Sequence, residues 1–319
     1  MMKLQGRRIV VTGCAGFIAS HLAEELLAKG NEVVGVDNLS AGKREFMTGM
    51  LSDDRFTFVQ GDLLTMDLGK VLSGSDVLCH LAANPDVRLG AKNTHIHFQQ
   101  NIEVTYRLLE ASKDHGIKDI LFPSTSTVYG ETAVMPTPED YGPLLPISVY
   151  GASKLACEAL VSSYCHTFDQ SAVLYRFANV VGTRSTHNVL HDFIRKLRED
   201  PEHLEILGAE PGTSKSYVHV KDCVSGMIAG AEGAKEQVEV YNIGSRDWMT
   251  VKDIADIVVE EMGLPNVEYR WTGGVKGGRG WVGDVKRMLL SVDRLEACGW
   301  EPKLNSREAI RRAVQEILA

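Results

Sequence analysis

The amino-acid sequence predicts an α/β fold in which a doubly wound, mainly parallel sheet is joined to a smaller C-terminal α/β domain. Three observations predict it. Apolar, β-branched runs alternate with amphipathic helical segments over residues 1–180, as in parallel sheets that are covered by helices. A glycine turn directly follows the first apolar run. Small or polar residues also stand at the carboxyl ends of successive strands, where the ligand crevice of such a sheet lies. These residues are Gly13, Asp37, Ala82, Thr125 and Asn179.

The composition is that of an ordinary globular protein. The 319 residues are 44% hydrophobic and 24% charged, with a formal net charge of −8. We therefore expect no nucleic-acid partner and no anionic membrane partner, since both need a basic surface. No apolar run reaches the roughly 18 residues of a membrane span, and no secretory signal is visible. The six cysteines are scattered, so we expect reduced thiols and a cytoplasmic location.

The first strand, turn, helix and second strand predict a dinucleotide site. Strand 8–12 leads into Gly13-x-x-Gly16, a helix follows, and strand 32–36 ends at Asp37. Small residues in the turn let the backbone approach a pyrophosphate, and the helix N-terminus supplies amide donors. An acid after the second strand accepts hydrogen bonds from ribose hydroxyls and repels a 2′-phosphate. The unit therefore predicts a Rossmann-type domain that prefers NAD to NADP.

Later segments add residues to the cofactor side. Strands at 56–59, 77–81 and 120–122 continue the alternation, and a long helix over 94–114 contains Asn101. Asp62 follows the third strand and is either an adenine contact or a plain turn residue. The residues expected at the cofactor are Gly13, Gly16, Phe17, Ile18, Asp37, Asn38, Asp62, Leu63, Leu81, Ala82, Ala83, Asn101, Tyr150 and Lys154.

Tyr150 and Lys154 are the candidate proton-transfer pair. On a helix, residues four apart lie on one face, so the phenol and the ammonium can converge. A fixed cation favours the phenolate and lowers its pKa from ~10. The spacing alone is common on solvated helix faces, but the cofactor turn and Thr125 place the pair at the crevice. Thr125 is either a partner of the reacting oxygen or a strand-end hydroxyl that bonds its own backbone.

Beyond residue 180 the alternation loosens. We expect an NAD-binding domain over 1–180, rejoined by parts of about 216–245, and a smaller substrate-binding domain over 181–319 that covers the crevice. Its expected elements are helices at 193–198, 250–262 and 306–318, strands at 216–220 and 238–242, and a Gly-rich stretch at 271–283.

At its motifs the chain resembles the extended short-chain dehydrogenase/reductase family, and within it the nucleotide-sugar epimerase branch. The resemblance covers nearly the whole chain. The motifs are Thr12-Gly13-x-x-Gly16-Phe17-Ile18-Ala19-Ser20-His21, Asp37-Asn38-Leu39-Ser40, His80-Leu81-Ala82-Ala83, the segment 124–130, Tyr150-x-x-x-Lys154, Arg176-Phe177-Ala178-Asn179-Val180-Val181-Gly182 and Gly283-Asp284-Val285.

The resemblance implies NAD-dependent C4 epimerisation that interconverts UDP-galactose and UDP-glucose through a 4-keto sugar. In this reading Tyr150 takes the proton of the 4-hydroxyl and returns it. Lys154 holds the nicotinamide ribose and keeps Tyr150 ionised, and Thr125 hydrogen-bonds the reacting oxygen. The resemblance also implies a homodimer through the helices at 94–114 and 149–168.

It further implies a diphosphate site. Asn179 matches a family asparagine, and Lys215 stands where many relatives carry arginine. Trp281 replaces a second arginine, so Arg279 is the expected phosphate ligand. Met288 lies at the sugar-size gate and leaves N-acetylated sugars open. The expected substrate residues are Asn84, Thr125, Ser126, Asn179, Val189, Lys215, Arg279 and Met288.

Other functions stay open. A UDP-N-acetylhexosamine 4-epimerase would share the same machinery. Relatives that act as 4,6-dehydratases or UDP-glucuronate decarboxylases carry an acid where this chain has Ser126, which favours epimerisation. A catalytically silent dinucleotide sensor would lose the Tyr150 and Lys154 pair. The paired His and Cys residues lack metal-ligand spacing, so we expect no metal site.

Overall fold

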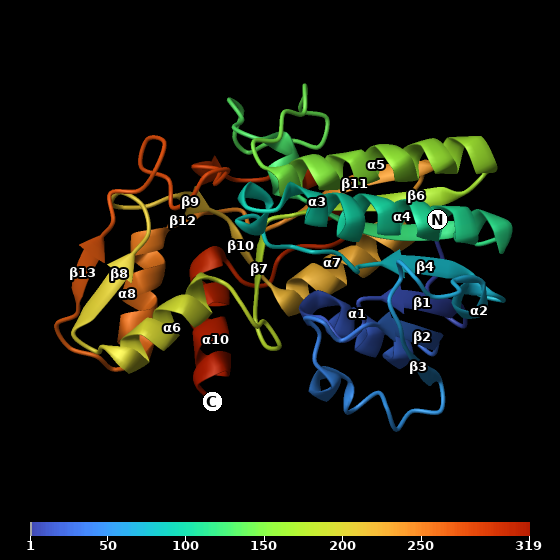
Figure 1. The fold of residues 1–319 in the computed structure, drawn as a ribbon, viewed down its shortest axis with the longest axis horizontal. Helices are drawn as coiled ribbons and strands as arrows, with labels where there is room; N and C mark the ends of the chain where they lie inside the picture. Colours follow the sequence, from blue (N-terminus) through green and yellow to red (C-terminus); the bar gives the residue numbers. More distant parts are fainter. Residues whose placement is uncertain (1) are drawn as a thin grey trace.

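The computed structural model, which describes residues 2–319, is built around a seven-stranded sheet (Figure 1). The strands are ordered β11-β6-β5-β4-β1-β2-β3, and every neighbouring pair is parallel. The strand order reverses between β1 and β4, which is where an open α/β sheet holds its ligand. The predicted doubly wound Rossmann-type fold is confirmed. The strands are β1 (Arg8–Thr12), β2 (Glu32–Asp37), β3 (Phe56–Gln60), β4 (Val77–His80), β5 (Asp119–Thr125), β6 (Ser171–Phe177) and β11 (Val238–Ile243).

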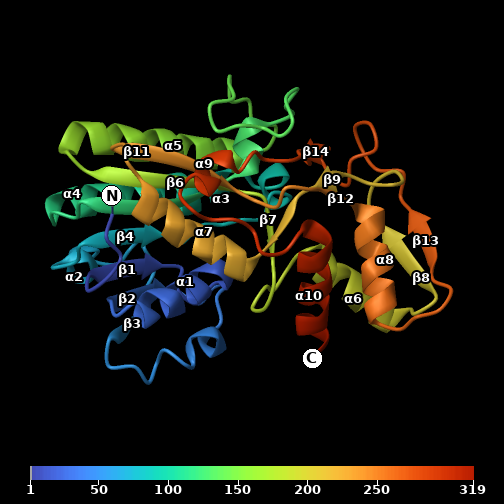
Figure 2. The ribbon, with the colours of Figure 1, turned by 180° about the vertical axis from the view of Figure 1, so that it is seen from behind.

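Helices cover both faces of this sheet (Figures 1 and 2). The alternation of strand side chains sets the two layers: in β1, Ile9 and Val11 join the core beneath α1 and α7, whereas Val10 joins the core beneath α2 and α4. The layer on one face is α1 (Phe17–Ala28) with α7 (Val220–Gly233), and the other is α2 (Gly69–Leu72), α4 (Val104–Asp114) and α5 (Val149–Phe168).

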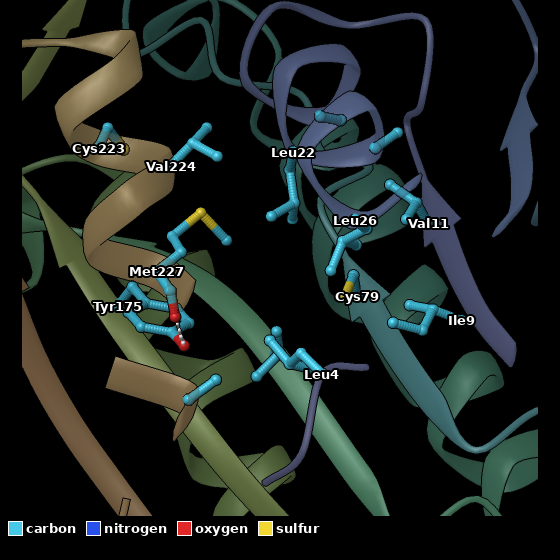
Figure 3. Packing of buried hydrophobic residues seen from close by; sticks show 14 of the residues in the cluster. Leu4, Ile9, Val11, Leu22, Leu26, Cys79, Tyr175, Cys223, Val224 and Met227 are labelled. Atoms are coloured by element: carbon cyan, nitrogen blue, oxygen red, sulfur yellow. Dashed lines mark hydrogen bonds between the residues drawn. The ribbon is translucent and has the colours of Figure 1, made fainter. Parts of the chain in front are cut away.

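The core under α1 and α7 contains the largest fully buried side chain, Tyr175 of β6 (Figure 3). Its hydroxyl donates to the carbonyl of Met227 on α7 at 2.6 Å. Leu22 and Leu26 of α1 pack into the same cluster with no exposed surface. The polar end of Tyr175 is thus satisfied inside an apolar layer, as a buried tyrosine requires.

The predicted helix at 94–114 is interrupted. It consists of α3 (Thr94–His97), a π-helical turn η3 (Phe98–Glu103) and α4. A π-turn inserts one residue into the helical hydrogen-bond ladder and redirects the side chains around it. Asn101 lies in this turn and is 1% exposed.

Strand β11 comes from residues far along the chain and pairs with β6 over its whole length, from Val238 opposite Ala172 to Ile243 opposite Phe177. The chain between these two strands forms β7, α6, β8, β9, β10 and α7. The division into two domains at about residue 180 stays a prediction.

The C-terminal part has its own core, in which α6, α8 and α10 pack together. Thr250 and Asn305 cap α8 and α10 with reciprocal capping boxes. None of the helices in the described part of the chain is long and apolar enough to cross a membrane. The elements are α6 (Val189–Glu199), α8 (Val251–Glu261), α9 (Asp293–Glu296), α10 (Ser306–Leu318), β7 (Asn179–Val181), β8 (His203–Ile206), β9 (Ser214–Lys215), β10 (Tyr217–His219), β12 (Met249–Thr250), β13 (Glu268–Trp271) and β14 (Arg287–Met288).

Candidate functional site

The turn between β1 and α1 can pack closely on the segment after β4 only because its residues are small. Gly13 has φ +71°, and a Cβ there would lie 3.0 Å from the backbone nitrogen and Cα of Ala82. The amide of Gly16 donates to the carbonyl of Gly13 at 2.8 Å, which closes the turn. The turn opens the N-terminus of α1 at the strand-order reversal, and this geometry fits a pyrophosphate.

Asp37 ends β2 beside this turn and is 9% exposed. One carboxylate oxygen accepts from the amide of Ala15 at 3.0 Å, and the other accepts from the amide of Leu39 at 2.7 Å. Burial raises the pKa of this carboxyl group. Each carboxylate oxygen can accept a further hydrogen bond, so the fixed acid fits the ribose diol of a dinucleotide.

The other cofactor-side residues divide by burial. Asn38 and Asp62 are exposed. Asp62 accepts from the amide of Leu64 at 2.9 Å, so it acts as a turn residue in the folded chain, and its contact with adenine stays a prediction. The rest, which are partly or fully buried along the turn and the β3 and β4 ends, are Phe17, Ile18, Leu63, Leu81, Ala82 and Ala83.

Asn101 joins the loop after β4 to helix α5. Its side-chain oxygen accepts from the amide of Asn84 at 2.8 Å, and its side-chain nitrogen donates to Ser153 Oγ at 2.9 Å. The hydroxyl of Ser153 in turn donates to the carbonyl of Tyr150 at 2.7 Å. One asparagine in the π-turn therefore fixes the β4 loop relative to the helix that carries Tyr150.

The buried side chain of His80 links the segment after β4 to Asn101 through two threonines. His80 Nδ1 lies 2.9 Å from Thr12 Oγ1, and His80 Nε2 lies 3.0 Å from Thr105 Oγ1. Thr12 Oγ1 accepts from the amide of Ala82 at 3.1 Å, and Thr105 donates to the carbonyl of Asn101 at 2.7 Å. Burial lowers the pKa of His80 to about 3, with a smaller contribution from the Lys154 charge.

Thr125, Tyr150 and Lys154 meet beyond the end of β5. Thr125 is the last residue of β5, and α5 begins at Val149 after Ser148 caps it by accepting from the amide of Gly151 at 3.0 Å. The Lys154 ammonium lies 4.0 Å from the centre of the Phe122 ring, also on β5. The Thr125 side chain interacts with the Tyr150 phenol, and Lys154 lies one helical turn further along α5, against the same strand.

Burial dominates the electrostatics of this group. Burial raises the pKa of Tyr150 to about 12, and only the interaction with the Thr125 side chain opposes it. Burial lowers the pKa of Lys154 to about 8. Lys154 is not among the groups that shift the phenol pKa in the chain by itself, so its expected lowering of this pKa stays a prediction for the chain with its ligands bound.

Two side chains beside Tyr150 were not predicted from the sequence. His97 lies against it with ring centroids 5.7 Å apart, and burial lowers the pKa of this imidazole. Ser153 supports its backbone. Ser153 has a usable signal, because it stands three residues after Tyr150 on the same helix. His97 has none, since the π-turn that presents it follows no sequence pattern. Ser126 adjoins Thr125 and is 9% exposed.

Asn179 and Lys215 lie beyond the end of β6. The side-chain amide of Asn179 donates to the carbonyl of Ser216 at 3.3 Å. Next to it, the Lys215 ammonium forms an ion pair with Asp284 at 2.5 Å, and the two side chains are 14% and 2% exposed. Asp284 is a partner that the sequence did not reveal, because 69 residues separate it from Lys215.

Arg279 is occupied by other protein groups. Its guanidinium donates to Glu131 at 2.6 Å, to the carbonyl of Asp284 at 2.9 Å and to the carbonyl of Lys276 at 2.6 Å. These contacts join the Gly-rich loop to the loop after β5. Its role as a phosphate ligand stays a prediction, and it would require these bonds to rearrange.

Val189 and Met288 complete the substrate-side set. Val189 is the first residue of α6 and is half-buried. Met288 is 7% exposed and lies in β14, in register with Lys215 of β9.

Comparisons with known proteins agree with this geometry. Residues 9–244 match the family model described as NAD dependent epimerase/dehydratase family. A Bacillus subtilis protein named as an uncharacterized UDP-glucose epimerase, YtcB, is 35% identical over 263 residues, which are 80% of this chain and 82% of that relative. The UDP-glucose 4-epimerase of Mycolicibacterium smegmatis is 30% identical over 317 residues, which are 97% of this chain and 97% of that relative.

Solved structures extend the likeness to the whole fold. A crystal structure of a UDP-galactose 4-epimerase has a TM-score of 0.86 and 40% identity, with 98% of both chains covered. The UDP-glucuronic acid 4-epimerase of Bacillus cereus, solved with UDP-glucuronic acid and NAD, has a TM-score of 0.88 and 30% identity, with 98% of this chain and 99% of that one covered. NAD is the cofactor, as Gly13, Gly16 and Asp37 predicted. The chain belongs to the NAD-dependent epimerase/dehydratase family.

Proposed function

We propose that the protein is a nucleotide-sugar 4-epimerase that interconverts UDP-galactose and UDP-glucose through a 4-keto sugar. The observation that carries the proposal is that Thr125, at the end of β5, interacts with Tyr150, one helical turn before Lys154 on α5. Epimerisation at one carbon needs a single proton to leave and return at one oxygen, and this group contains one candidate base for that task.

In this proposal Tyr150 accepts the proton from the sugar 4-hydroxyl and later returns it. Thr125 orients the reacting oxygen, since its side chain interacts with the phenol. Lys154 supplies positive charge beside the developing phenolate. When bound, NAD supplies the hydride acceptor and a positively charged ring. Because the phenol pKa is about 12 in the chain by itself, both cations are needed to make proton removal feasible near neutral pH.

An uncharged residue beside Thr125 supports epimerisation over elimination. Ser126 is buried and cannot act as an acid near neutral pH. Loss of water from the sugar, as in a 4,6-dehydratase, requires a second acid or base at neighbouring carbons. In relatives that catalyse elimination, the expected acid directly follows the residue that corresponds to Thr125. This chain has Ser126 at that position.

A homodimer in a reducing compartment such as the cytoplasm is part of the same proposal. Aromatic side chains are exposed on η3, α4 and α5, namely Phe98 (53%), Tyr106 (48%) and Phe168 (39%). Exposed aromatic side chains on η3, α4 and the adjacent α5 support an interface through these helices. All six cysteines are free thiols, and five of them are buried.

The test is incubation of the purified protein with UDP-galactose, with and without added NAD, followed by separation of the products by chromatography. UDP-glucose is the expected product. Parallel reactions with UDP-N-acetylgalactosamine and UDP-glucuronic acid test the sugar. Conversion of one of these two sugars without conversion of UDP-galactose would reassign the substrate. A 6-deoxy-4-keto product from UDP-glucose would show that the reaction is dehydration and not epimerisation.

A further inference from the structure

The Gly-rich loop carries a buried hydrogen-bond donor with no acceptor. The indole Nε1 of Trp281 is inaccessible to solvent and has no partner among the described residues. Buried polar groups in folded proteins are almost always paired, and one without a partner costs free energy. Such an orphaned donor at the edge of a ligand site indicates a state of the site in which an acceptor reaches it.

The indole also lies over Lys215, whose ammonium is paired with the carboxylate of Asp284. Lys215 Nζ lies 5.4 Å from the centre of the Trp281 ring and 2.5 Å from Asp284. In this arrangement the ammonium is neutralised by the carboxylate and shielded by the ring. The indole N–H cannot contact a ligand until Trp281 moves, and the Lys215 side chain is only 14% exposed.

The loop around Trp281 is rich in glycine, so few of its own side chains restrain the indole. Gly277, Gly278 and Gly283 have φ values of +85°, +88° and +88°, a region that glycine adopts without strain. The loop also touches the catalytic helix: a Cβ on Gly283 would lie 3.1 Å from Ser148 Cβ, directly before α5. A change at Trp281 is therefore adjacent to the start of the helix that carries Tyr150.

We propose that Trp281 is a ligand-responsive specificity residue of the nucleotide-sugar site. Its ring leaves Lys215 when the ligand binds, and its indole N–H then donates to an anionic oxygen of the ligand's diphosphate, beside the freed ammonium. The inference rests on the proposed function, because it assigns the group that the same site recognises. A neutral sugar hydroxyl does not compete with the carboxylate of Asp284 for Lys215, whereas a diphosphate does so by its charge.

Tryptophan fluorescence with UDP alone tests the inference without any turnover. The chain has four tryptophans. We expect UDP to change the emission of the wild type, and we expect Trp281→Phe to abolish that change. Phenylalanine keeps an aromatic face for Lys215 and removes only the donor. UDP affinity, measured by calorimetry, should fall by at least about ten-fold, the effect of one hydrogen bond to a charged acceptor.

Matched variants separate this effect from damage to the fold. Trp248→Phe replaces an exposed tryptophan (42%) and should leave both the signal and the affinity unchanged. Trp281→Arg supplies a charged donor at the same position and should bind UDP at least as tightly as the wild type. Thermal unfolding of each variant identifies any that does not fold, and Trp281→Arg then carries the test.

Each outcome decides the matter. Unchanged UDP affinity and emission response in Trp281→Phe overturn the inference and leave the proposed function intact. An equal response to uridine, which has no phosphate, overturns the assignment to an anionic oxygen. Failure of the wild type to bind UDP overturns the proposed function together with the inference.

Discussion

His80 Nδ1 lies 2.9 Å from the hydroxyl of Thr12, and the directions of the surrounding hydrogen bonds leave the ring a single neutral tautomer. Thr12 accepts from the amide of Ala82, and its own proton can point to an unprotonated Nδ1. Thr105 donates to the carbonyl of Asn101, so it accepts from Nε2–H. Nδ1 is then the unprotonated nitrogen that accepts the Thr12 proton, and a second proton on the imidazole would have to displace this hydrogen bond.

We therefore expect His80 to weaken the protein in acid. Its folded pKa of about 3 is below the unfolded value of 6.5, so the unfolded state takes up the proton first. The contribution of neutral His80 to the free energy of unfolding is fully present above pH 6.5 and is lost as the pH falls toward 3. Between pH 7 and 4.5 the loss from this residue is about 3 kcal/mol. Urea unfolding of wild type and His80→Gln at both pH values measures it; a constant difference between the two proteins would contradict the assignment.

Lys154→Met should produce a more stable and inactive protein. The ammonium has a folded pKa of about 8 against 10.5 when unfolded, so its burial destabilises the fold below pH 8 and ceases to do so above 10.5. The penalty is about 3 kcal/mol, and loss of the contact with the Phe122 ring offsets ~1–2 kcal/mol of the gain. Unfolding free energies at pH 7 and 9.5 should give a gain that shrinks at the higher pH.

Tyr150→Phe should lower kcat by roughly 10² to 10⁴, the range of a lost acid–base group. The phenyl ring keeps the contact with His97, so NAD binding, measured by calorimetry, should stay near the wild-type value. Tyr164→Phe is the matched control on the same helix, because its hydroxyl bonds to Glu110 rather than to a residue of the site. Similar turnover in the two variants would remove Tyr150 from the proposed mechanism.

Asp37→Ala should reduce the preference for NAD over NADP at least about ten-fold, since it removes both an acceptor for the ribose and a charge that repels a 2′-phosphate. Direct binding titrations with the two cofactors measure the ratio. Glu32→Ala removes an exposed carboxylate at the opposite end of β2 and should not alter it. An equal change in both variants would mean that net charge, not the position of Asp37, decides the preference.

The ion pair of Arg176 and Glu158 should be costly to break. Their side chains are 6% and 5% exposed and form two bonds of 2.8 and 3.1 Å. Glu158→Gln leaves a buried guanidinium without its counter-charge, so we expect a loss of about 3–5 kcal/mol in urea unfolding. Glu199→Gln breaks an exposed pair with Arg195 and should change the unfolding free energy by no more than the experimental error.

Local patterns predicted the fold and the positions of the main site residues. Strand ends, the glycine turn and helix spacing all act over a few residues, so Gly13 and Asp37 could be assigned without the structure. The relation of Tyr150 to Lys154 follows from helix geometry alone.

Contacts between distant segments could not be predicted in this way. The neighbours of His80 are 68 and 25 residues away in sequence, and Lys215 finds Asp284 only after β9 and β14 pair. The pKa of Tyr150 depends on how completely the folded chain excludes water, which a spacing does not report. The π-turn at Asn101 also left no mark in the hydrophobic pattern.

Strand β11 has a consequence for synthesis of the protein on the ribosome. Six of the seven strands of the main sheet are complete once Phe177 has emerged, but β6 pairs on its outer side only with residues 238–243. A nascent chain that has not reached Ile243 therefore presents an unpaired row of backbone N–H and C=O groups along β6, which other chains can join. Truncation or stalled translation within this interval leaves an aggregation-prone edge, even though the residues of the dinucleotide turn are already in place.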